Sequence, residues 1–326
     1  MKYRLLGHNT GLAVSQFVLG TARMGKMHNG KSDPAEALQI LHHFADAGGN
    51  FIDTSSAYQG GIAEQLVGEF LNPSKRDDFV IASKYCRTPL STPARAAHGN
   101  HRKAMRAEVE GSLKRLKTDH IDVYFVHFDD GITPIDEIMR GLDDLVRAGK
   151  ILYIGLSNMP VWRMASASMM AQWRGLSPVS VMQMQYNLLE RTIEREFIPF
   201  AQATGMAVMA WSPLFGGVLA KETAENPEYA DALFVLGQIA DRLQKSRAEI
   251  ALAWLLAKNT LPVLGPRTLD QLSGGLTAGD IVLSDDDITA LEQAFAFVAG
   301  YPYDLLSATR HAAGYDGLGD NHYAVL

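Results

Sequence analysis

The sequence predicts an α/β fold, a closed (β/α)8 barrel of the TIM type preceded by an N-terminal β-hairpin. Eight short apolar segments alternate with longer amphipathic ones, and the first seven apolar segments are almost evenly spaced. This alternation is typical of parallel strands that are each followed by a helix. No change in composition marks a second domain, and such barrels commonly reach this length. We therefore interpret residues 1–326 as one barrel domain.

The predicted strands are short, apolar or rich in β-branched residues, and bounded by Gly, Pro, Ser or Asp, as buried parallel strands are. They cover residues 16–20, 51–54, 79–84, 121–127, 151–157, 179–185, 206–212 and 261–265. The opening segment, 2–20, alternates around a turn that contains glycine. This pattern predicts a hairpin that closes the bottom of the barrel.

The helical patterns repeat apolar residues every three or four positions. The clearest of them cover residues 34–48, 101–116, 134–149, 230–243 and 248–258. Three other stretches, 85–100, 213–229 and 299–326, are irregular. Barrel enzymes build their sites from loops at the C-terminal ends of the strands, so we expect these stretches to face the substrate.

Composition and charge exclude several classes of function. The net charge of −6 argues against nucleic acid or an anionic membrane as the main partner. A single cysteine, Cys86, excludes an intramolecular disulfide and a thiolate metal cluster, and the ten histidines lack metal-ligand spacing, so no metal is expected. Neither a signal peptide nor a membrane span is visible, so we expect a cytoplasmic protein. The oligomeric state stays open.

Polar residues stand at the ends of three successive predicted strands. Asp53 comes near the end of the second strand, with Tyr58 five residues later; Lys84 ends the third strand and His127 the fourth. The C-terminal ends of neighbouring parallel strands meet at one rim of a barrel, so we expect these four side chains to converge.

Together the four residues predict a proton-transfer site. A tyrosine hydroxyl has an ordinary pKa of ~10, which is high for proton donation near neutral pH. A neighbouring ammonium lowers that pKa, and a carboxylate holds the ammonium in place. We therefore expect Asp53 and Lys84 to form a pair that tunes Tyr58 as general acid, while His127 orients or polarises a carbonyl group.

The order of several motifs resembles that of the aldo-keto reductase superfamily, in particular its longer, largely microbial branch, which includes the potassium-channel β subunits. The resemblance runs from about residue 3 to residue 295, about nine tenths of the chain. The motifs that carry it are FIDTSSAY (51–58), IASK (81–84), GSLKRLKTDHIDVYFVHFDD (111–130), GKILYIGLSN (149–158), MQMQYNLL (182–189), AWSPLFGG (210–217) and LPVLGPRTLDQL (261–272). The resemblance implies an NADP-dependent oxidoreductase that reduces a small aldehyde or ketone to the alcohol.

The resemblance places the family's catalytic tetrad on the same four residues: Asp53, Tyr58, Lys84 and His127. It also implies a set of contacts to NADP(H) after the successive strands. Ser157 and Asn158, with Gln183, would hydrogen-bond the carboxamide of the nicotinamide, Trp211 would lie against the nicotinamide face, and Arg267 would meet the 2′-phosphate. The expected cofactor residues are Gly20, Thr21, Asp53, Ser157, Asn158, Gln183, Trp211, Ser212, Pro213, Leu214, Lys221, Gly265, Arg267 and Gln271.

The substrate itself is not predicted, but some residues of its site are. Besides Tyr58 and His127, we expect Arg23, after the first strand, and Phe128 to contact it. The sequence departs from the family's pattern after Gln271, where Gly274 and Gly275 replace the usual Glu and Asn. This departure removes expected contacts to the adenosine part of the cofactor.

Two other interpretations remain open at the level of sequence. One is a regulatory subunit that binds NADP(H) and senses redox state, which the channel β subunits suggest. The other is a hydrolase in a barrel of the same kind, which would use Asp53 paired with Asp129 or Asp130 as its two carboxylates.

Overall fold

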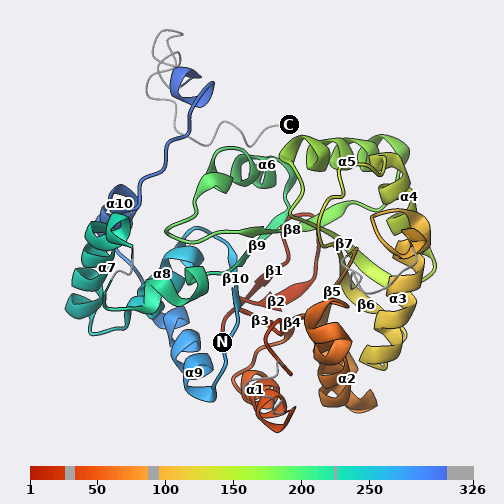
Figure 1. Ribbon diagram of the computed structural model, residues 1–326, viewed down its shortest axis with the longest axis horizontal. Helices are drawn as coiled ribbons and strands as arrows, with labels where there is room; N and C mark the ends of the chain where they lie inside the picture. The colour runs from red at the N-terminus through yellow and green to blue at the C-terminus, as the bar shows by residue number, and fades with distance from the viewer. Residues whose placement is uncertain (26–33, 87–94, 224–225, 307–326) are drawn as a thin grey trace.

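The barrel predicted from the sequence is present in a computed structural model, which describes residues 1–25, 34–86, 95–223 and 226–306. Eight parallel strands close on themselves, because the last strand pairs with both the first and the seventh. The helices surround the strands (Figure 1). In barrel order the strands are β3 (Val18–Gly20), β4 (Phe51–Asp53), β5 (Val80–Tyr85), β6 (Ile121–Val126), β7 (Ile151–Ser157), β8 (Val179–Gln185), β9 (Ala207–Trp211) and β10 (Leu261–Leu264).

The strand boundaries agree with the predicted ones to within two residues at every end. The strands β7 and β8 agree residue for residue. Two small differences bear on the site: β5 extends one residue beyond Lys84, and β6 ends one residue before His127. The backbone of His127 still continues the ladder, because its N–H donates to the carbonyl of Tyr85 on the neighbouring strand.

Ten α-helices accompany the strands in the part of the chain that the structure describes. They are α1 (Pro34–Asp46), α2 (Ile62–Lys75), α3 (Arg102–Leu116), α4 (Ile135–Arg147), α5 (Val161–Arg174), α6 (Phe197–Thr204), α7 (Ala230–Leu243), α8 (Arg247–Ala257), α9 (Leu269–Thr277) and α10 (Asp285–Ala294). The five predicted helical segments correspond to α1, α3, α4, α7 and α8. Within the described residues, no helix is both long enough and apolar enough to cross a membrane.

The N-terminal hairpin covers one end of the barrel, as the sequence predicted. Its strands, β1 (Tyr3–Leu5) and β2 (Ala13–Ser15), pair in antiparallel fashion. Leu6 and Val14 are fully buried in the same cluster as the side chains that fill the interior of the barrel. These interior side chains lie mainly near the N-terminal ends of the strands, so the hairpin closes that end and leaves the C-terminal end for the site.

Parts of the three irregular stretches lie outside the described residues: 87–94, 224–225 and 307–326. The described part of the stretch after β9 contains a 3-10 helix, Phe215–Ala220. Gly216 and Gly217 have φ angles of 67° and 103° there, a backbone conformation that favours glycine. These two glycines allow the chain to turn sharply at the C-terminal end of β9.

Candidate active site

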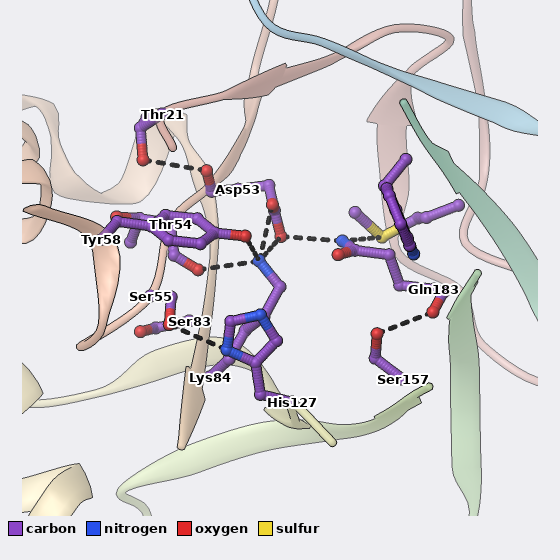
Figure 2. A network of polar contacts seen from close by, with 12 residues as sticks. Thr21, Asp53, Thr54, Ser55, Tyr58, Ser83, Lys84, His127, Ser157 and Gln183 are labelled. Carbon is purple, nitrogen blue, oxygen red and sulfur yellow. Dashed lines mark hydrogen bonds and ion pairs between the residues drawn. The ribbon is translucent and has the colours of Figure 1, made fainter. Parts of the chain in front are cut away.

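The four side chains expected to be catalytic meet at the C-terminal ends of three neighbouring strands (Figure 2). Asp53 is the last residue of β4, Lys84 lies near the end of β5, and His127 follows β6. Tyr58 begins a short 3-10 helix, Tyr58–Gly61, in the segment that connects β4 to α2. Pairing of β4 with β5 and of β5 with β6 brings residues far apart in the chain to one rim.

The ammonium group of Lys84 lies at the centre of the site and contacts three other groups. Its Nζ atom lies 2.7 and 2.6 Å from the two carboxylate oxygens of Asp53 and 3.0 Å from the carbonyl oxygen of Thr54. It also lies 3.0 Å from the hydroxyl oxygen of Tyr58. Because an ammonium has three protons to donate, these three groups satisfy it fully. The side chain of Lys84 is completely buried.

Burial and ion pairing act in opposite directions on Lys84. Removal from water by itself would lower the pKa of the ammonium, but attraction to Asp53 and to the Tyr58 oxygen, with the hydrogen bonds to both, raises the pKa above its ordinary value. Lys84 therefore stays positively charged at neutral pH. A buried charge of this kind is tolerated only where a partner compensates it, and Asp53 is that partner.

Asp53 is held from a third side by Gln183, near the end of β8. The Nε2 atom of Gln183 donates to Oδ1 of Asp53 at 2.9 Å. The hydroxyl of Ser157 donates to the carbonyl of Gln183 at 2.7 Å. The pair at the centre of the rim is thus linked across the barrel mouth to β7 and β8, where the expected nicotinamide contacts lie.

His127 stands on the other side of Tyr58. Its ring is 5.7 Å from that of Tyr58, edge to face, and it stacks on Phe128 with the centroids 4.6 Å apart. Its Nδ1 atom is 3.2 Å from the hydroxyl oxygen of Ser55, a fully buried residue. Our sequence analysis missed Ser55, although its place two residues after Asp53 in the same strand-end segment was a usable signal.

The expected nicotinamide residues form one connected group. Asn158 donates from Nδ2 to the carbonyl of His127 and to the hydroxyl of Ser157, each at 2.9 Å. The indole N–H of Trp211 donates to Oδ1 of Asn158 at 3.2 Å. The ends of β6, β7 and β9 are thereby tied together beside the central ion pair.

The remaining expected cofactor residues continue around the rim. Thr21 lies next to the centre, since its backbone N–H and its hydroxyl both donate to the carbonyl of Asp53, at 2.9 and 3.1 Å. Lys221 is exposed in the stretch after β9. The others lie at or after the ends of β3, β9 and β10: Gly20, Ser212, Pro213, Leu214, Gly265, Arg267 and Gln271.

The segment after β10 is organised by the N-terminus of α9. The hydroxyl of Thr268 caps the helix by accepting the N–H of Gln271, and Oε1 of Gln271 accepts the N–H of Arg267 at 2.8 Å. The side chain of Arg267 is exposed at this helix end. Backbone N–H groups and a nearby guanidinium at a helix N-terminus favour an anion.

The two residues expected to contact a substrate besides Tyr58 and His127 occupy different places. Phe128 is stacked on His127 and is 39% exposed. Arg23 is exposed in the turn after β3. Phe128 thus contacts one of the four central residues directly, whereas Arg23 lies in the turn that follows β3.

The three carboxylates considered for a hydrolase, those of Asp53, Asp129 and Asp130, each form ion pairs or hydrogen bonds with other groups. Asp129 forms a buried ion pair with Arg163, 2.8 Å from its Nε atom. Asp130 accepts hydrogen bonds from the backbone N–H groups of Asn100, Ile132 and Thr133. Asp53 is itself paired with Lys84. This arrangement does not supply the pair of carboxylates that the hydrolase interpretation required.

Comparison with known proteins gives a consistent result. Residues 16–296 match the model of the aldo/keto reductase family. The chain is 33% identical to norsolorinic acid reductase B of Dothistroma septosporum over 334 residues, which cover 95% of this chain and 85% of that protein. It is also 33% identical to an aryl-alcohol dehydrogenase of Pestalotiopsis microspora, over 94% of this chain and 85% of the other.

A similar fold is found among solved structures. A thermostable aldo-keto reductase in complex with the inhibitor epalrestat superposes with a TM-score of 0.77 and 28% sequence identity, covering 90% of this chain and 100% of that one. The segment that matches the family model, residues 16–296, includes all eight barrel strands and the four residues at their rim. The chain therefore belongs to the aldo/keto reductase family of oxidoreductases.

Proposed function

We propose that this protein reduces a small aldehyde or ketone to the alcohol by hydride transfer from NADPH, with Tyr58 as the proton donor. The observation that carries the proposal is the buried Lys84 ammonium, which contacts the carboxylate of Asp53 and the hydroxyl of Tyr58 at once. A charged group held in this way next to a phenol has a clear use in proton transfer.

The donor set of the rim fits NADP(H). The polar group of Ser157, Asn158 and Gln183 suits the carboxamide of a nicotinamide, and Trp211 beside it suits the ring face. Exposed Lys221 and Arg267, the latter at the N-terminus of α9, suit the phosphates. When bound, the cofactor supplies the hydride for the carbonyl carbon.

Residues of the chain itself would donate the proton that the carbonyl oxygen needs. Tyr58 would donate its hydroxyl proton to the carbonyl oxygen as negative charge develops there. The Lys84 ammonium, 3.0 Å from the Tyr58 oxygen, would stabilise the phenolate that remains. Asp53 keeps Lys84 in position, and the raised pKa of Lys84 keeps it charged. His127 would donate a second hydrogen bond to the carbonyl oxygen and so polarise the bond.

Aromatic carbonyl compounds are the substrates we propose first. Phe128, partly exposed beside His127, and Trp211 offer aromatic surfaces at the site. One similar protein is named an aryl-alcohol dehydrogenase. We also propose the cytoplasm as its location, because a chain with a single cysteine suits a reducing compartment.

The proposal is tested by measuring the oxidation of NADPH in the presence of benzaldehyde-type substrates. The decrease in the absorbance of NADPH reports the rate. Tyr58→Phe removes the proton donor and keeps the ring, so we expect kcat to fall by at least ~100-fold while the dissociation constant for NADPH stays the same. Activity of Tyr58→Phe within a few-fold of wild type would rule out Tyr58 as the general acid.

A further inference from the structure

Ser55 links two parts of the site that the chain brings together from far apart. It lies between β4 and Tyr58, is fully buried, and has its hydroxyl oxygen 3.2 Å from Nδ1 of His127 (Figure 2). The same oxygen accepts the backbone N–H of Ala57 at 3.2 Å, and the carbonyl of Ser55 accepts the N–H of Tyr58. Ser55 therefore contacts the segments of both residues expected to act on a carbonyl oxygen.

The neighbours of Ser55 determine which way its hydroxyl points. A serine hydroxyl has one proton to donate, and the N–H of Ala57 can only be a donor to its oxygen. Within the described part of the chain, Nδ1 of His127 is the one acceptor recorded for the proton of this hydroxyl. A proton on Nδ1 would leave the buried hydroxyl proton without a partner, which is unfavourable. Nδ1 is therefore the acceptor, and a neutral ring carries its proton on Nε2.

The aromatic contacts of His127 do not by themselves select this state. Stacking on Phe128 at an interplanar angle of 23° and the edge-to-face contact with Tyr58 fix the plane of the ring. A rotation of the ring by 180° keeps that plane but exchanges each nitrogen with a carbon. A hydrogen bond to one named nitrogen distinguishes the two orientations, and Ser55 makes such a bond at Nδ1.

We propose that Ser55 is a positioning residue that holds His127 as the neutral tautomer with its proton on Nε2. In this state the imidazole is a donor, which is what the polarisation of a carbonyl oxygen requires. The benefit to catalysis rests on the proposed function, whereas the state of the ring is a property of the protein alone. Ser55 acts through His127.

The state of the ring can be measured without turnover, by ¹⁵N NMR of protein labelled at histidine, with the His127 signals assigned by their loss in His127→Gln. In the wild type we expect an unprotonated Nδ1 and a protonated Nε2. In Ser55→Ala both signals should move toward the average of the two tautomers. A protonated Nδ1 in the wild type, or an unchanged ring in Ser55→Ala, overturns the proposal.

Kinetics with a matched control complete the test. Ser15→Ala is the control, because Ser15 is also fully buried and its hydroxyl also accepts one backbone N–H and donates to one acceptor, in the N-terminal hairpin. We expect Ser55→Ala to lower kcat about three- to ten-fold, the range for loss of one neutral hydrogen bond, with NADPH binding unchanged. Ser55→Thr keeps a hydroxyl and should recover much of the lost kcat. The kcat of Ser15→Ala should match that of the wild type.

The two proposals fail in different ways. A wild-type protein that reduces no carbonyl compound, yet shows the expected His127 ring, contradicts the proposed function and supports the role of Ser55. A wild-type protein that reduces aldehydes while Ser55→Ala keeps full kcat and the same ring supports the proposed function and overturns the role of Ser55.

Discussion

At the scale of single residues, the choice of cofactor depends on few side chains after β10. Arg267 is exposed beside the capped N-terminus of α9, where a phosphate would meet both a guanidinium and backbone N–H groups. Gly274 is exposed, and Gly275 is buried against Leu264, so neither offers a polar side chain to the adenosine end of a cofactor. The proposed preference for NADPH therefore depends heavily on Arg267.

We expect Arg267→Ala to weaken NADPH binding by about ten-fold or more and NADH binding much less. A charge-assisted contact is worth roughly 1.5–3 kcal/mol, and partial exposure reduces this value. Fluorescence titration with each nucleotide measures both effects. Arg106→Ala, at an exposed arginine of α3, is the control and should change neither. Equal losses for NADPH and NADH in Arg267→Ala would show that Arg267 does not recognise the 2′-phosphate.

At the scale of elements, the loop after β6 is fixed in place by Asn100, which lies just before α3. Asn100, fully buried, donates from Nδ2 to the carbonyl of Phe128 and accepts the N–H of Asp130. Asp130 in turn accepts four hydrogen bonds, from the N–H groups of Asn100, Ile132 and Thr133 and from the hydroxyl of Thr133. The loop that carries Phe128 therefore depends on an ionised Asp130.

These bonds make the stability of the loop depend on pH. Burial by itself would raise the pKa of Asp130, but the four hydrogen bonds lower it to about 2. Because this value lies below that of an unfolded Asp, ~3.9, the folded state gains stability from Asp130 above about pH 4 and loses it as the pH falls toward about 2.

We therefore expect Asp130→Asn to lower the free energy of unfolding by about 1 kcal/mol at pH 7, with the difference from wild type shrinking as the pH falls from about 4 to about 2. Urea unfolding at several pH values measures this difference. Asp46→Asn, at an exposed residue at the end of α1, is the control and should follow wild type. A difference that stays constant over this range would contradict the account of Asp130.

At the scale of the whole molecule, closure of the barrel joins its first and last strands, and the N-terminal hairpin packs beneath them. The strand β10 pairs with β3, and the hairpin contributes Leu6 and Val14 to the interior of the barrel. The N–H of His8 donates to the carbonyl of Gly205, just before β9. On this basis we propose that residues 1–326 fold as one domain.

One domain predicts one thermal transition, in which near-UV and far-UV circular dichroism change together. Leu6→Ala removes a fully buried side chain from the hairpin and should lower the midpoint of both signals by a few degrees, because such changes cost about 2–5 kcal/mol. Leu5→Ala, at a neighbour that is 50% exposed, should shift them far less. A separate early transition in Leu6→Ala would indicate that the hairpin unfolds independently.

The sequence by itself determined the strands and the central tetrad. Buried parallel strands are apolar over their whole length and end at turn residues, so their boundaries are visible in one chain, and β7 and β8 were predicted residue for residue. A polar residue at such an end is conspicuous, which is why Asp53, Lys84 and His127 were found. The prediction of helices was less complete. The helices α2, α5, α6, α9 and α10 were not delimited, because a helix that packs on a barrel needs only a narrow apolar face.

Only the tertiary structure decided how the tetrad is held. The contact of Ser55 with His127 joins residues 72 positions apart in the chain. The hydrogen bonds between Asn100 and Asp130 join residues 30 positions apart. Their side chains are small and polar, and the same residue types serve as caps, turns and surface groups elsewhere. Whether such a residue is fully buried against a particular ring nitrogen depends on which strands are neighbours and in what register, and local patterns in the chain do not encode that.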